Sequence, residues 1–352
     1  MTHRNDANAD RPVKIARIRR ILADRGAPAL HLASPAALAW LFDGARTGVP
    51  LGGAPVFSAT VDADGGVRVT TLANEADRLA EEEICGTVEW DVVPWHAALD
   101  TAVPGALREG DAMAELRAAR AVLTPAERDR YRALGTDTAR AVTRILERAE
   151  PTWTERELAG RLARAAYEIG AEPAVALVAG ESRGRVPHPI PTDAPLGHRA
   201  LAVVTTVRHG LHASMSRWVR FGGEDPFADT EAALRDVEAD AFAATRAGRR
   251  LGDVLADVAS AYARHGFGDD AWRAHHQGGP TGYAGRDPKA HPDADEILDA
   301  PQAFAWNPWV PGAKLEDTVI ACDDGIEVLT RDAAWPTVDV RGLARPVTLV
   351  RD

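Results

Sequence analysis

The amino-acid sequence predicts two domains, a smaller α/β domain over residues 1–120 and a larger α+β domain over residues 121–352. Three observations predict this division. Strand-like and helix-like segments alternate up to about residue 95, which is typical of α/β domains. A helix-start signal follows at Leu123-Thr124-Pro125. Beyond it, helices and strands come in separate runs, as in helices packed on a curved antiparallel sheet.

The first domain is predicted from short apolar strands separated by helix and turn signals. The segment LHLASPAALAWLFDGAR, residues 30–46, joins an apolar strand to a helix that begins at Ser34 and Pro35. Two β-rich segments flank turn residues at 62–66 and predict a hairpin. The remaining predicted elements are a helix over residues 13–26, a helix over 74–83 and a strand over 87–95.

The second domain begins with two helices whose starts are marked by capping boxes. Thr124 and Glu127 form the first box and Thr154 and Glu157 the second, and the helices are predicted to run to about residues 148 and 170. Strands are then predicted at 175–180, 201–207, 215–221, 303–310, 317–322 and 325–330, and helices at 229–247 and 250–265.

Composition indicates a globular, cytoplasmic protein of bacterial type. Of its 352 residues, 45% are hydrophobic and 26% charged, which is enough for a large core. The net charge of −11 argues against nucleic acid as a partner, because phosphate contacts need a basic surface. The two cysteines, Cys85 and Cys322, fit no disulfide framework. The absence of a signal peptide and of an apolar run near ~18 residues predicts no membrane segment.

The most informative segment is residues 198–217, HRALAVVTTVRHGLHASMSR, which contains no Asp or Glu. VPHPIPTD (186–193) precedes it, and AHHQGGPTGYAGRD (274–287), AWNPWVPG (305–312) and KLEDT (314–318) follow. In this order and rough spacing, the segments resemble the creatinase/aminopeptidase P/methionine aminopeptidase family, the "pita-bread" metallopeptidases of family M24. The resemblance implies a pita-bread domain over residues 121–352 behind a creatinase-like N-terminal domain.

The family binds two metal ions through Asp, Asp, His, Glu and Glu, and the resemblance implies that three of these carboxylates are missing here. The second Asp falls on Ser214, and the first on Val203 or a neighbour such as Val204 or Thr205. The first Glu falls on Asn307. Hydroxyl, amide and apolar groups replace carboxylates poorly at a site for two hard cations.

Only two of the five ligand positions keep a ligand, at His276 and Glu316, and a second family His falls on Tyr283. We therefore predict no metal and no cofactor. The adjacent His275 and His276 would face opposite ways on a strand, so we expect only His276 to point into the site. Glu316 is either its orienting carboxylate or a solvated charge.

The predicted catalytic acid–base is His188, which matches the proton-shuttling His of creatinase, a family member that works without metal. An imidazole suits this role near neutral pH. The alternative is an ordinary surface residue on a loop between Pro187 and Pro189. With His276 and Glu316, His188 completes the predicted catalytic set.

The predicted substrate-binding residues are polar or aromatic groups around that set. Arg286 lies in GYAGRD, which resembles a Y-G-R-E run of creatinase, so it either holds a substrate carboxylate or forms a structural ion pair. His212 and His209 flank Gly210 and are the alternative ligands for a single metal ion. Tryptophans such as Trp306 belong more often to a core than to a pocket. The full predicted set is Ser214, His212, Tyr283, Arg286, Trp306 and Asn307.

These observations favour a metal-independent, creatinase-like hydrolase that cleaves a C–N bond in a small amide, guanidine or amino-acid derivative. One alternative is a catalytically inactive pita-bread module that binds a partner. Another is an atypical Xaa-Pro aminopeptidase-like enzyme with a mononuclear metal site. The resemblance also implies a homodimer acting on a small molecule.

Overall fold

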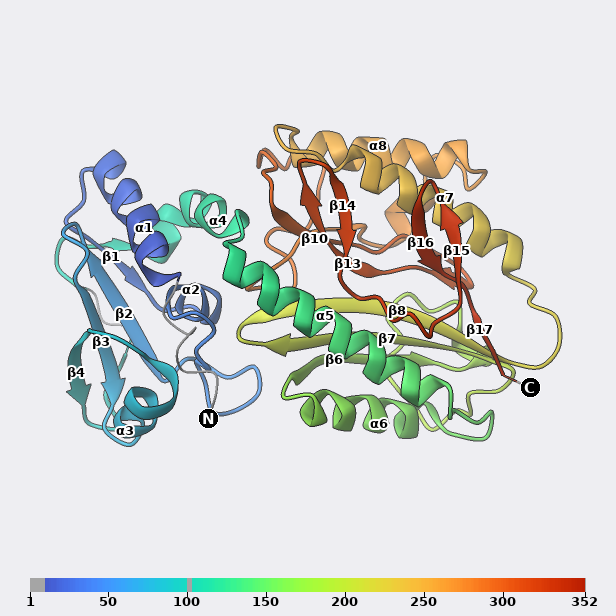
Figure 1. Cartoon of the computed structure of the whole chain (residues 1–352), viewed down its shortest axis with the longest axis horizontal. Helices are drawn as coiled ribbons and strands as arrows, with labels where there is room; N and C mark the ends of the chain where they lie inside the picture. The colour runs from blue at the N-terminus through green and yellow to red at the C-terminus, as the bar shows by residue number, and fades with distance from the viewer. Residues whose placement is uncertain (1–9, 100–102, 352) are drawn as a thin grey trace. The chain divides into compact units, whose positions relative to one another are not determined.

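The computed structural model describes residues 10–99 and 103–351 (Figure 1). Its contacts divide the chain into an N-terminal unit, residues 1–130 with 209–211, and a C-terminal unit, residues 131–208 with 212–352. Each unit has sheets of its own. The boundary that we predict at 120/121 lies at the end of helix α4 (Met113–Ala121), shortly before this division.

The N-terminal unit is built on a mixed five-stranded sheet in the order β4-β3-β2-β1-β5. Its strands are β1 (Ala29–Leu32), β2 (Phe57–Asp62), β3 (Val67–Leu72), β4 (Glu89–Val93) and β5 (Leu107–Arg108). Its helices are α1 (Arg11–Arg25), α2 (Pro35–Leu41), α3 (Ala76–Arg78) and α4, and a π-helical turn over Leu79–Glu83 extends α3. This alternation of strands and helices confirms the predicted α/β character.

Two local signals in this unit form as predicted. The Ser34 hydroxyl caps α2 by accepting a hydrogen bond from the Ala37 N–H at 3.1 Å. In the β2–β3 hairpin, Asp62 Oδ1 accepts the backbone N–H groups of Asp64 and Gly66. Both contacts lie within four residues of sequence, which is why the sequence alone predicts them.

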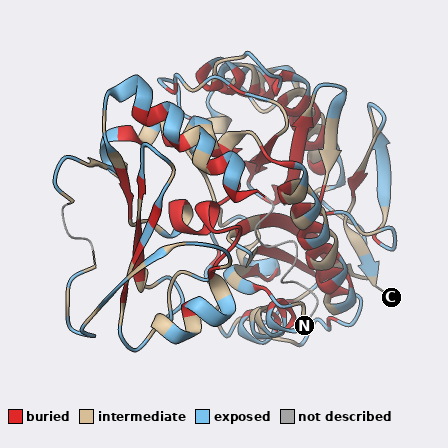
Figure 2. Cartoon of the chain, turned by 60° about the vertical axis from the view of Figure 1, so that its left-hand side comes forward, coloured by how far each residue is buried: buried red, intermediate tan, exposed pale blue. Residues whose placement is uncertain are grey.

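The C-terminal unit packs two pairs of helices on two four-stranded sheets. Helices α5 (Pro125–Leu146) and α6 (Glu155–Glu168) share a buried apolar cluster with the sheet β17-β8-β7-β6. Helices α7 (Ala228–Ala244) and α8 (Leu251–Arg264) share another with the sheet β14-β13-β10-β9. Buried residues follow the strands and the helix sides that face them (Figure 2). This arrangement confirms the predicted α+β architecture.

The strands of this unit agree with the predicted set except in three places. The strands are β6 (Glu172–Ala179), β7 (Arg199–Arg208), β8 (Leu211–Phe221), β9 (Gly278–Pro280), β10 (Gln302–Trp306), β11 (Trp309–Val310), β12 (Ala313–Lys314), β13 (Asp317–Cys322), β14 (Gly325–Val328), β15 (Thr337–Val340), β16 (Leu343–Pro346) and β17 (Leu349–Arg351). The sequence analysis missed β9, β12 and the three strands after residue 330, whereas β11 lies inside the strand predicted over residues 303–310. Among the residues described, no helix has the length and apolar character that crossing a bilayer requires.

The two sheets of the C-terminal unit meet where β8 runs beside residues 314–318. The Ser216 N–H donates to the Glu316 carbonyl at 2.9 Å, and the Thr318 hydroxyl bonds both the N–H and the carbonyl of Ser214. A buried ion-pair network also joins these strands, because Asp317 contacts Arg217 at 2.8 Å and Arg345 at 2.7 Å. The candidate site is built at this junction.

Candidate active site

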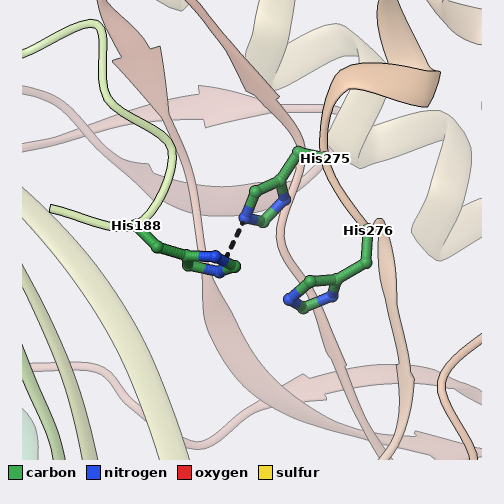
Figure 3. A group of neighbouring side chains, drawn as sticks. All are labelled: His188, His275 and His276. Carbon is green, nitrogen blue, oxygen red and sulfur yellow. Dashed lines mark hydrogen bonds between the residues drawn. The ribbon is translucent and has the colours of Figure 1, made fainter.

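Three imidazoles gather in the C-terminal unit (Figure 3). His188 lies on the loop between β6 and β7, and His275 and His276 lie just before β9. The Nε2 atoms of His188 and His275 are 3.1 Å apart, and one ring nitrogen from each of the three side chains lies within 4.8 Å of the others. His188 is the exposed member, and His275 is buried.

The neighbouring rings of His275 and His276 lie side by side, so the prediction that they face opposite ways is wrong. The two rings stack with centroids 4.5 Å apart and planes 22° apart. The pair precedes β9 and follows a 3-10 turn over Ala271–Ala274, so strand alternation does not apply there. Gln277 holds the segment, because its amide nitrogen donates to the His275 carbonyl at 2.8 Å.

Gly278 explains why the histidine segment approaches β10 so closely. Its φ of 102° lies in the left-handed region, and a Cβ atom there would stand 2.1 Å from the Ala305 carbonyl oxygen. Any larger residue would push the His275–His276 segment away from the sheet. Gly278 therefore positions the histidine segment, because only glycine allows this close backbone packing.

Lys314 is the site residue that the sequence analysis missed. It lies on β12 opposite Trp309, is 1% exposed, and places its Nζ 3.2 Å from His275 Nε2. Burial lowers the pKa of the Lys314 ammonium to about 8, with Glu316 opposing and Arg286 reinforcing the shift. One feature of the sequence pointed to Lys314. It lies two residues before Glu316, and in a regular strand these two side chains point to the same face of the sheet.

The imidazoles of this group are neutral at physiological pH. Burial, followed by the charge of Lys314, lowers the pKa of His275 to about 2. Burial, followed by the charge of Arg286, lowers the pKa of His276 to about 3. Burial and Lys314 also lower the pKa of His188, against an opposing effect of Glu316. A neutral imidazole is able to accept a proton, as a general base must.

Glu316, the remaining carboxylate, is bound by a cation of the chain itself. Arg286 Nη2 donates to Glu316 Oε1 at 2.6 Å, and both side chains are largely buried. A second Arg286 nitrogen, Nη1, donates to the Gly285 carbonyl. Of the two alternatives for Arg286, the structure places it in the internal ion pair.

The positions that lack carboxylates carry neutral groups. Of the three alternatives for the first of them, the structure brings Thr205 next to Ser214, with their hydroxyl oxygens 2.9 Å apart. Asn307 is buried, and its Oδ1 has no hydrogen-bond partner among the described residues. This side of the site therefore offers hydroxyl and amide groups and no negative charge.

Comparisons with known proteins agree with this architecture. The family model of metallopeptidase family M24 matches residues 129–322, which is more than half of the chain. The chain belongs to metallopeptidase family M24. The M24 chain has the pita-bread fold predicted from its motifs, and no curated protein with a matching sequence is found.

Solved structures resemble the M24 chain over nearly its whole length. The prolidase from Pyrococcus horikoshii OT3 matches at 15% identity and a TM-score of 0.74, over 91% of this chain and 98% of that one. The Xaa-Pro dipeptidase from Bacillus anthracis matches at 14% identity and a TM-score of 0.74, over 97% of this chain and 100% of that one. The dipeptidase PepE from Mycobacterium ulcerans matches at 20% identity and a TM-score of 0.73, over 97% of this chain and 98% of that one. At these identities the likeness shows the fold.

The two-metal centre that the family implies does not fit the residues of this chain. Thr205 and Ser214 bond each other, Asn307 is an amide, and the Glu316 carboxylate is held by Arg286. A second cation beside Arg286 would meet repulsion where the family needs several anionic oxygens.

The alternative ligand set of His209, His212, His276 and Glu316 is not assembled either. Among the described residues, the group with metal-compatible spacing consists of His188, His275 and His276. His212 instead lies against the Gly282 carbonyl, 3.1 Å from its Nδ1. His212 therefore has a backbone partner, and the metal-compatible spacing is found at His188, His275 and His276 instead.

Two other predicted substrate residues are buried. Trp306 is fully buried in the core cluster with α7 and α8, stacks on Phe304, and donates its indole N–H to Thr245 at 2.9 Å. This is a packing position, and it corrects the substrate-binding role predicted for Trp306. Tyr283 is 6% exposed and lies on the loop that leads to Arg286.

A cavity of about 490 Å³ lies beside the β12 strand. Trp218 and Phe227 supply its aromatic lining, and the Trp218 indole N–H also donates to the Lys314 carbonyl at 3.2 Å. None of the three clustered histidines lines it. The cavity is thus a neighbour of the imidazole group, joined to it through Lys314.

Proposed function

We propose that this M24 chain is a metal-independent hydrolase that cleaves a C–N bond in a small amide, guanidine or amino-acid derivative. The observation that carries the proposal is the Arg286–Glu316 ion pair, 2.6 Å long, at a position where the family binds metal. A guanidinium there supplies positive charge to the site without an ion. The three neutral imidazoles beside it supply proton transfer.

In this proposal His188 moves the proton. The neutral imidazole takes a proton from water while the water oxygen bonds to the substrate carbon. The same proton passes to the leaving nitrogen as the C–N bond breaks, so the products gain one water molecule between them. The lowered pKa of His188, caused first by burial and then by Lys314, keeps the base form available at neutral pH.

The neutral groups of the site are assigned to substrate binding. Asn307 has an unpaired, buried amide oxygen that is able to accept an N–H group of an amide or guanidine. Ser214 and Thr205 offer hydroxyls on the same side.

A second candidate is a mononuclear metallohydrolase, and the spacing of His188, His275 and His276 favours it. Three neutral imidazoles form a familiar ligand set for zinc. Two observations count against it. The Lys314 Nζ stands 3.2 Å from His275 Nε2. Among the described residues, the Nδ1 atoms of His275 and His276 lack the hydrogen-bond partners that metal-binding imidazoles usually have.

Metal analysis of the purified protein separates the two candidates. We expect less than about a tenth of a metal ion per chain, because the site has no free carboxylate to balance a divalent charge. Hydrolysis of a panel of N-acyl amino acids, amides and guanidines should proceed equally with and without chelator. Tight binding of one zinc ion per chain, with activity lost on chelation, would replace the first candidate with the second.

The His188→Gln variant tests the catalytic assignment. We expect kcat to fall by about 10²–10⁴-fold, because the amide cannot exchange a proton as imidazole does. The thermal midpoint should change little, since His188 is exposed. His291→Gln, an exposed histidine that makes no contact with the three clustered rings, is the matched control and should keep full activity. Full activity of His188→Gln would refute the role, and no turnover by any preparation would favour the binding-module alternative.

A further inference from the structure

Lys314 is an unusual buried cation. Among the described residues, three Lys or Arg residues are no more than 1% exposed: Lys14, Lys314 and Arg345. Lys14 contacts the carboxylates of Asp43 and Glu127, and Arg345 contacts those of Glu238 and Asp317. The Lys314 ammonium forms no ion pair with a described carboxylate, and its one hydrogen-bond contact among the described residues is His275 Nε2 at 3.2 Å. A buried charge without a counter-charge is costly and calls for an explanation.

The nearest candidate counter-charge is already engaged. Glu316 raises the pKa of Lys314 through its charge, but its carboxylate is bound by Arg286 at 2.6 Å. Glu316 is thus the one carboxylate acting on both Arg286 and Lys314, and it contacts Arg286 alone, which leaves the site with an excess positive charge. That charge is directed at the lone pair of a neutral imidazole.

The contact with Lys314 decides which nitrogen of His275 carries the proton. An ammonium group has three donors and no acceptor, so His275 Nε2 must accept from it. The proton of the neutral His275 ring then sits on Nδ1. This leaves a buried Nδ1–H without a partner among the described residues. That cost is smaller than the cost of turning an imidazole N–H toward a buried ammonium.

The tautomer of His275 in turn decides the tautomer of His188. The two Nε2 atoms are 3.1 Å apart, and His275 Nε2 is already an acceptor. A nitrogen that accepts carries no hydrogen, so the hydrogen of this contact belongs to His188 Nε2, and the single lone pair of His275 Nε2 is shared by two donors. The free lone pair of the exposed His188 ring is then on Nδ1, which becomes the nitrogen that accepts a proton from water.

We propose that Lys314 is a positioning residue that acts through His275 to hold His188 in the Nε2–H tautomer, with Nδ1 as the catalytic base. The inference rests on the proposed function for its catalytic part, and on geometry alone for the tautomers. It assigns a reason for an unpaired lysine in the interior, because a carboxylate partner would divert the ammonium from the imidazole.

Nitrogen-15 NMR of the full-length protein labelled in its histidines tests the proposal at neutral pH. We expect His275 to carry its proton on Nδ1 and His188 on Nε2, with assignments from His188→Gln and His275→Gln. In Lys314→Met the ammonium is lost, so His275 should shift its proton to Nε2 and donate to His188. Lys314→Arg, which only donates, should keep the wild-type pattern. Lys289→Met removes an exposed neighbouring charge that makes no hydrogen bond to either ring, and it should leave both tautomers as in the wild type.

Kinetics supply the second measurement. In Lys314→Met we expect kcat to fall by about a hundredfold with little change in KM, as for loss of a general base, and Lys314→Arg to recover most of it. A wild-type His275 protonated on Nε2, identical tautomers in wild type and Lys314→Met, or full kcat in Lys314→Met would each overturn the proposal. If the tautomers switch as expected but no preparation hydrolyses the substrate panel, the positioning of His188 stands and the proposed function fails.

Discussion

Two buried cations of the C-terminal unit are treated in opposite ways. Arg345 is enclosed by Glu238 and Asp317 at 2.6 and 2.7 Å, and these carboxylates raise the pKa of its guanidinium against the lowering effect of burial. Lys314 has only an imidazole partner, and burial lowers the pKa of its ammonium to about 8. The positive charge of Arg345 is therefore balanced by carboxylates in the network that joins the strands. The positive charge of Lys314 is not balanced in this way beside the clustered histidines.

The largest expected effect is the loss of stability that follows when the ion pairs of Asp317 are removed. Asp317→Asn removes the carboxylate that Arg217 and Arg345 share, so both guanidiniums lose a buried partner. We expect the free energy of unfolding to fall by about 3–5 kcal/mol, measured by urea denaturation. Glu168→Gln, which breaks the exposed pair with Arg164, is the control and should cost less than about 1 kcal/mol. Equal small losses in both variants would mean that the buried network adds no stability.

The second prediction is a gain in the free energy of unfolding, in the variant Lys314→Met. Lys314→Met removes a buried charge whose pKa in the folded protein is near 8 and in the unfolded chain near 10.5. Between these values the unfolded chain binds more protons, so the stability of the wild type rises with pH there. The penalty is complete below pH 8, and we expect the variant to be more stable by about 3 kcal/mol at pH 7.

The difference between Lys314→Met and wild type should shrink as the pH passes 8 and vanish above about 10.5. Urea denaturation of both proteins across this pH range measures it. A destabilised variant at pH 7 would show that the ammonium is better compensated than its contacts indicate. The surroundings of Lys314 would then resemble those of Arg345, where carboxylates balance the buried charge.

The smallest effect concerns the pH profile of kcat/KM. The pKa of His188 is lowered by burial and then by Lys314 and Lys289, against Glu316, so the acidic limb should lie below pH 6.5. Loss of the Lys314 proton, beside His275, Glu316 and Arg286, should give an alkaline limb near pH 8. In Lys314→Arg this limb should move beyond pH 10, because guanidinium stays protonated. An unchanged alkaline limb would assign it to another group.

Local signals explain which parts of the fold could be predicted from sequence. The Thr124–Glu127 capping box forms at 2.8 and 3.2 Å, and the Thr154–Glu157 box forms as well. These contacts need only neighbouring residues and a helix. The last strand, β17, could not be predicted in the same way, because it pairs with β8, more than a hundred residues earlier. The β15–β16 hairpin pairs locally and was missed nonetheless.

The site was predictable in composition and less so in arrangement. Family motifs pointed to His188, His276 and Glu316, and the structure places all three in the C-terminal unit around one junction. The side on which His275 points depends on backbone angles before β9, which no residue pattern announces. Lys314 was passed over because its burial depends on segments far from it in sequence. Homodimer formation and cytoplasmic location stay predictions.

The Arg286–Glu316 pair bears on what such a protein would need from the cell. A guanidinium is attached to the chain, so it is present once in every folded molecule. It cannot be withdrawn by a chelator, exchanged for a competing ion or lost when transition metals are scarce. On the proposed function, a site charged in this way would be complete as soon as the chain has folded, and its activity would follow the amount of protein and not the supply of metal.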